Sequence, residues 1–143
     1  MNLKATLIVT LLLAGNFAHA ESVIKDIDFS RAAFQKQLSL TCKFTTECID
    51  AEACGDTTYG GALIGDAGGA QANDMAVVLT FQSDSGDQEF VGSLKDDVYK
   101  TMNIIGGANH MMTIAADGTA HYTVHMPDVP MAITYTGICE DAK

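Results

Sequence analysis

The feature that most constrains the fold is a two-residue period of apolar side chains near both ends of the chain. Apolar and polar residues alternate over residues 38–45, and Cys42 belongs to the apolar set. Residues 131–139 alternate in the same way, with Cys139 on the bulkier face. This period is typical of a β-strand with one buried face. Both cysteines are therefore predicted to point inward from strands.

Similar signals lie between these ends. Alternating apolar residues predict strands around 75–81 and 90–94, separated by the turn Ser83–Asp87, and a further strand at 58–64. Residues 65–74 are rich in Gly, Ala and Asp and are predicted to form a loop. Six to eight short strands without a long helical period predict an all-β domain, either an antiparallel barrel or a two-sheet sandwich.

The clearest local prediction is a hairpin over residues 111–126. A three-residue loop, 116–118, with Gly118 in the left-handed conformation would place Met112 opposite Tyr122. A two-residue Asp-Gly turn would shift the register by one residue and mix histidines with the apolar face. Because a one-residue slip inverts the faces of a strand, the apolar pattern favours the three-residue loop.

The first twenty residues have the form of a cleaved signal peptide. Lys4 precedes the apolar run 5–14, and Ala18-His19-Ala20 has the small-x-small form of a cleavage site. The apolar run is too short to span a bilayer, so no membrane anchor is expected. The protein is therefore predicted to be periplasmic or secreted.

The remaining length fits one domain. Residues 21–37 are predicted to be a flexible or short helical lead-in, since Ser30 could cap a short helix over 31–37. Residues 38–143 are predicted to form a single antiparallel β domain.

Export changes the interpretation of the four cysteines, because disulfides form in oxidising compartments. Three pairings are possible. The short spacing favours Cys48–Cys54, which leaves Cys42–Cys139 to join the first and last strands. A zinc site is the alternative, but the spacings lack the paired C-x2-C units of such sites.

The charge balance restricts the partners. The chain contains eighteen acidic and eight basic residues, which gives a formal net charge of −10. Nucleic acid and anionic membrane surfaces both require clusters of Lys and Arg, so neither is an expected partner. A basic protein is an expected partner, because an acidic module steers such a protein toward itself.

Histidine and methionine are the candidate metal ligands. His110, His121 and His125 occur near several methionines, and a His and Met mixture in an exported protein suggests copper. However, His121 and His125 would lie about 13 Å apart along one strand. The alternative is structural, with methionines filling gaps in the core.

The sequence contains no recognisable catalytic or cofactor motif. The glycine-rich stretch 59–69 lacks the Lys-Ser/Thr pair of a phosphate-binding loop and is predicted to be a surface loop with positive φ angles. No serine lies in a G-x-S-x-G elbow. No cofactor is expected.

The cysteine-bearing ends, residues 40–54 and 135–140, resemble a group of small exported bacterial proteins without an assigned function. A more distant likeness is to the membrane-bound inhibitors of c-type lysozyme, small periplasmic β-barrels with an early and a late cysteine. This chain differs from those inhibitors in lacking Trp and a lipid-attachment cysteine.

Together these features predict an exported, non-enzymatic binding module of inhibitor-like character, with an unknown ligand. Copper binding through His and Met is the alternative function. A hydrolytic enzyme is the second alternative.

Overall fold

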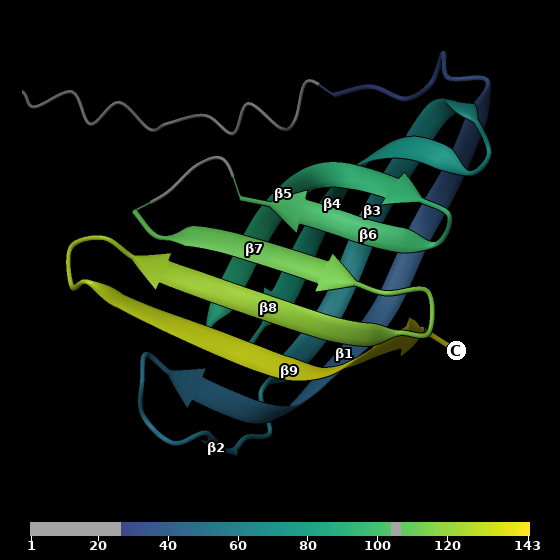
Figure 1. The fold of residues 1–143 in the computed structure, drawn as a ribbon. Helices are drawn as coiled ribbons and strands as arrows, with labels where there is room; N and C mark the ends of the chain where they lie inside the picture. The colour runs from purple at the N-terminus through teal and green to yellow at the C-terminus, as the bar shows by residue number, and fades with distance from the viewer. Residues whose placement is uncertain (1–26, 104–106) are drawn as a thin grey trace, which may run out of the picture.

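The computed structural model describes residues 27–103 and 107–143, and this part of the chain is all-β (Figure 1). The predicted signal peptide lies outside the described residues. The strands are β1 (Phe34–Ile49), β2 (Gly55–Asp56), β3 (Gly60–Gln71), β4 (Asp74–Ser83), β5 (Gly86–Lys95), β6 (Val98–Met102), β7 (Asn109–Ile114), β8 (Thr119–Met126) and β9 (Met131–Asp141).

The strands form a closed barrel. From β3 to β9 each strand pairs with its sequence neighbour in antiparallel orientation, and β1 pairs with both β3 and β9. Eight of the described strands thus close on themselves, while the two-residue β2 pairs only with the far end of β1. The prediction of an antiparallel β domain is confirmed, and of its two predicted architectures the structure has the barrel.

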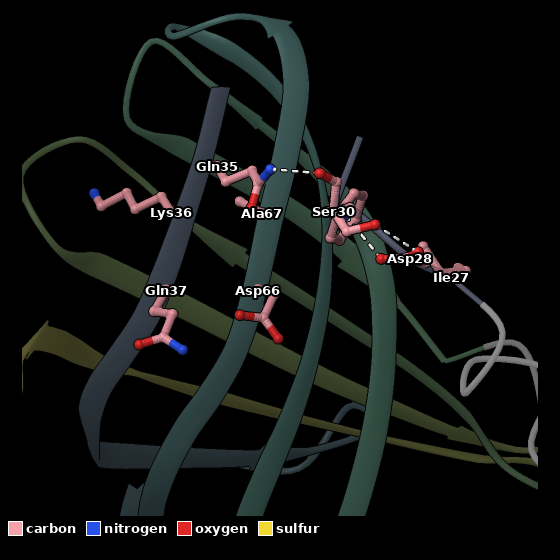
Figure 2. Close-up of a pocket in the computed structure, with 9 residues that line it drawn as sticks. Ile27, Asp28, Ser30, Gln35, Lys36, Gln37, Asp66 and Ala67 are labelled. Carbon is pink, nitrogen blue, oxygen red and sulfur yellow. Dashed lines mark hydrogen bonds between the residues drawn. The ribbon is translucent and has the colours of Figure 1, made fainter. Parts of the chain in front are cut away.

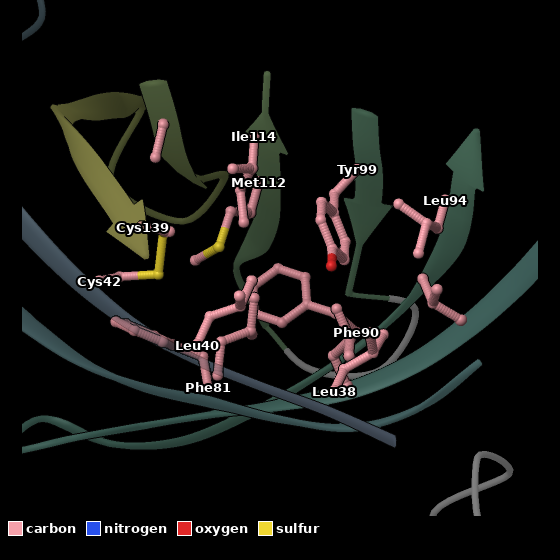
Figure 3. Close-up of a cluster of buried hydrophobic side chains, with 14 of the residues drawn as sticks. Leu38, Leu40, Cys42, Phe81, Phe90, Leu94, Tyr99, Met112, Ile114 and Cys139 are labelled. Atoms are coloured by element: carbon pink, nitrogen blue, oxygen red, sulfur yellow. A yellow bond between two sulfur atoms is a disulfide. The ribbon is translucent and has the colours of Figure 1, made fainter. Parts of the chain in front are cut away.

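The predicted inward faces fill the barrel. Along β1 the residues Leu38, Leu40, Cys42 and Phe44 are all buried, as the two-residue period requires. An eight-stranded barrel is just wide enough for its interior to be filled by side chains. Figure 3 shows Leu38, Leu40 and Cys42 meeting side chains from β4, β5, β6 and β7 in one core, to which Phe44 also belongs.

Both predicted disulfides are present. Cys42 on β1 bonds to Cys139 on β9, residues that stand directly opposite each other in the strand pair that closes the barrel (Figure 3). Cys48 bonds to Cys54 and joins the end of β1 to the segment before β2. Disulfides are consistent with an extracellular or periplasmic protein.

The β7–β8 hairpin has the predicted register. Met112 pairs with Tyr122, and the amide of Ala115 donates a hydrogen bond of 2.8 Å to the carbonyl of Thr119. Gly118 has a φ of 86°, which a residue with a side chain rarely adopts. The apolar pattern therefore predicted this hairpin correctly.

The loop prediction for the glycine-rich residues is wrong, whereas the strand predicted at 58–64 overlaps the start of a longer strand. Residues 60–71 form β3, which pairs with both β1 and β4. A Cβ atom on the inward-facing Gly61 would lie 2.1 Å from the carbonyl oxygen of Gln82, so this position needs glycine for close approach of the backbones. Glycines at such positions let barrel strands bend sharply. They mark a curved strand here and not a loop.

The predicted boundary at residue 38 is also corrected. β1 begins at Phe34, because residues 34–37 pair with 66–69 of β3. This pairing excludes the helix considered for 31–37. Before it, Ser30 and Arg31 form a turn in which the Ala32 amide donates to the Phe29 carbonyl. Residues 21–26 of the predicted lead-in lie outside the described residues.

Candidate functional site

One end of the barrel combines aromatic and acidic side chains. We call it the tyrosine end and define it by three segments: residues 44–60 around the end of β1, 81–90 around the β4–β5 turn, and 123–135 around the β8–β9 turn. The strand register brings these segments to the same end, since Lys43 pairs with Gly60, Gly61 with Ser83 and Ile49 with Ile133.

Three tyrosines meet just inside this end. Tyr59 precedes β3, Tyr122 lies on β8 and Tyr135 lies opposite it on β9. The ring centroids of Tyr59 and Tyr135 are 4.7 Å apart, and those of Tyr122 and Tyr135 are 5.7 Å apart. Phe44 packs against all three rings from β1. Tyr122 is buried, whereas Tyr59 and Tyr135 are partly buried and pack against the core.

A β-bulge adds a carboxylate to this cluster. The β1–β9 register shifts between Phe44 and Thr46, so Glu47 stands opposite Tyr135 and shares its face. Burial, followed by a hydrogen bond to the Glu47 carboxylate, raises the pKa of Tyr135 to about 12. The phenol is therefore a neutral hydrogen-bond donor at physiological pH.

His110 joins the cluster from β7. Its Nδ1 lies 2.6 Å from the Tyr122 hydroxyl, and the two rings stack at 5.9 Å. Burial lowers the pKa of His110, so the imidazole is neutral near pH 7. Burial and the neighbouring phenols of Tyr59 and Tyr135 raise the pKa of Tyr122. A phenol that resists ionisation is a poor nucleophile, so the contact is a hydrogen bond between two neutral groups.

The β4–β5 turn anchors the third tyrosine. The hydroxyl of Tyr59 lies 3.1 Å from Ser83 Oγ and 3.0 Å from Ser85 Oγ. Ser83 Oγ also donates to the carbonyl of Gly86 at 3.0 Å. These bonds fasten the Tyr59 ring to the β4–β5 turn.

The Asp, Glu, Lys and Arg residues of the three segments around this cluster are all acidic. The three segments of the tyrosine end contain eight carboxylates and no Lys or Arg. The acidic residues are Glu47, Asp50, Glu52, Asp56, Asp84, Asp87, Glu89 and Asp128. Lys43 is the nearest basic residue along β1, at the border of the first segment and on the outer face. The other basic residues among those described are Arg31, Lys36, Lys95, Lys100 and Lys143.

The three candidate histidines are not brought together. His110 points into the barrel, whereas His121 and His125 lie on the outer face of β8 and are exposed. Among the described residues, no group of three His, Cys, Asp or Glu side chains is arranged to hold a metal ion.

A cavity lies elsewhere, near the start of β1. It has a volume of about 640 Å³, between residues 27–30 and the adjoining parts of β1 and β3 (Figure 2). Gln35 Nε2 donates to the Ser30 carbonyl at 3.1 Å, and Ser30 Oγ donates to Asp28 at 2.7 Å. These hydrogen bonds fasten the lead-in to the barrel.

Comparisons with protein families, with characterised proteins and with solved structures found no match. Across residues 27–103 and 107–143, no helix has the length and apolar character required to cross a membrane.

Several residues of this site were not identified from the sequence. Tyr122 was predicted as core, but Glu47, Tyr59 and Tyr135 were not linked to it. Glu47 reaches the cluster only because of the β-bulge, and no local sequence pattern predicts that bulge. The sequence does hold one usable signal, namely that residues 44–94 contain no Lys or Arg.

Proposed function

We propose that this protein is an exported, non-enzymatic binding module that docks a basic protein surface at its tyrosine end. The observation that carries the proposal is the set of eight carboxylates, without Lys or Arg, in the segments that border three clustered tyrosines. A cluster of negatively charged carboxylates accelerates the encounter with a positively charged partner. Tyrosine is among the residues that contribute most to protein interfaces.

The barrel suits such a role because its framework is rigid. Its interior is filled by the core, and two disulfides fasten β1, the strand that supplies Phe44 and Glu47. A preformed surface loses less conformational entropy on binding than a flexible one. The raised pKa of Tyr122 supports the non-enzymatic assignment, since a phenol that resists ionisation is a poor nucleophile.

The test uses c-type lysozyme, a small basic enzyme, as the probe. We expect it to bind the immobilised protein, with an affinity that falls steeply as salt rises. Neutralising three exposed turn carboxylates, in the combined variant Asp84→Asn, Asp87→Asn and Asp128→Asn, should weaken binding strongly. Inhibition of lysozyme activity, measured in the same samples, tests the inhibitor-like form of the proposal.

The matched control removes the same charge elsewhere. Asp66→Asn, Asp97→Asn and Glu140→Gln neutralise three exposed carboxylates outside the tyrosine end. This variant should bind almost as well as the unmodified protein. Equal loss in both variants would show a general charge effect, and an absence of binding would contradict this docking proposal for lysozyme.

A further inference from the structure

Two methionines lie where a barrel normally presents polar side chains. Met102 on β6 is 52% exposed and Met111 on β7 is 47% exposed. Other methionines have a packing role, since Met75 and Met112 are 6% and 1% exposed in the core. Filling of core gaps therefore does not account for Met102 and Met111.

The strand register places these two thioethers side by side. Met102 pairs directly with Met111, and both lie on the outer face of the barrel. Directly opposite residues in antiparallel strands have Cβ atoms about 5 Å apart. The two sulfur atoms can therefore approach one ion together.

Two histidines flank the pair on the same face. Met111 pairs with Thr123 of β8, and His121 and His125 lie two residues to either side of Thr123. Such diagonal neighbours are about 7–8 Å apart, within reach of long side chains. Since the two histidines are about 13 Å apart along the strand, one ion can bind only one of them at a time.

We propose that this methionine–histidine patch, formed by Met102, Met111, His121 and His125, binds a soft monovalent cation, Cu(I) or Ag(I). Two thioethers and one imidazole match the preference of such ions for sulfur and nitrogen ligands. The cysteines do not compete, because all four are bonded in disulfides. The site differs from the predicted histidine triad, since it excludes the inward-facing His110. It is also independent of docking at the tyrosine end.

The test titrates Ag(I), which is redox-inert, into protein carrying ¹³C-labelled methionine methyl groups. The methyl signals of Met102 and Met111 should shift as one equivalent binds, while those of Met75 and Met112 stay in place. Native mass spectrometry should show one bound silver ion. The double variant Met102→Leu/Met111→Leu should lose this binding, and His121→Asn/His125→Asn should weaken it.

The chain offers a matched control in a second cross-strand methionine pair. Met126 and Met131 face each other at the β8–β9 turn, so Met126→Leu/Met131→Leu removes the same number of thioethers. This variant should retain silver binding. Retained binding in Met102→Leu/Met111→Leu, shifts confined to Met126 and Met131, or no stoichiometric binding by the unmodified protein would each overturn the proposal. Thermal unfolding of every variant verifies that it is folded.

Discussion

At the scale of single residues, the inward-facing polar side chains set the chemistry of the tyrosine end. His110 and Glu47 each bond a tyrosine that packs in the aromatic cluster. Their environments act in predictable directions, because burial disfavours the charged form of any group. The pKa shifts of His110 and Tyr135 can therefore be tested, the first through the pH dependence of stability and the second through absorbance titration.

His110 should make the protein less stable in mild acid. The pKa of His110 is lower in the folded protein than the ordinary value of about 6.5 in the unfolded chain. Between these two pKa values the unfolded state binds more protons than the folded state. The contribution is fully present above about pH 6.5 and is lost as pH falls through the folded pKa. Urea unfolding at several pH values should show this loss. His110→Asn should remove this pH dependence from the free energy of unfolding. An unchanged pH dependence in the variant would contradict its assignment to His110.

Glu47→Gln should lower the pKa of Tyr135 from about 12. The value should stay above the ordinary 10, because burial is the larger cause and remains in the variant. Absorbance titration of the phenolate measures the change. Glu52→Gln, at an exposed carboxylate of the same end, should leave the titration unaltered.

At the scale of strands, glycines allow the curvature of the barrel. Gly92 on β5 faces Thr101 on β6, and a Cβ atom there would lie 2.0 Å from the carbonyl oxygen of Lys100. The two strands can keep this spacing only if position 92 has no side chain. The same reason explains why β3 is a strand although its composition resembles that of a loop.

Gly92→Ala should therefore destabilise the protein, by an amount in the usual range of about 1–3 kcal/mol for overpacking. The free energy of unfolding in urea measures the effect. Gly55→Ala is the control, because a Cβ atom at position 55 meets nothing within 4 Å. Similar stability of the two variants would contradict the close-approach argument.

At the scale of the whole molecule, closure depends on pairing the first long strand with the last. Cys42 and Cys139 are 97 residues apart in sequence and opposite each other in the β1–β9 pair. Cys48 and Cys54 are only six residues apart. Chain-entropy arguments assign about 4.7 kcal/mol to a 100-residue loop and about 3 kcal/mol to a 15-residue loop.

Cys42→Ala/Cys139→Ala should consequently reduce stability more than Cys48→Ala/Cys54→Ala. The first pair is also buried in the core, so its removal leaves a cavity as well. Comparing the urea midpoints of the two double variants checks the order. A larger loss in Cys48→Ala/Cys54→Ala would show that closure of the barrel does not depend on the covalent bond.

The sequence by itself determined which faces of β1, β4 and β9 are buried, the register of the β7–β8 hairpin and the inward direction of Cys42 and Cys139. These properties follow from local periodicity, since a one-residue slip would expose an entire apolar face. Only the tertiary structure decided that the sheet closes into a barrel, that the bulge turns Glu47 toward Tyr135 and that Met102 lies beside Met111. These arrangements arise from pairing between strands, which the period within any one strand does not encode.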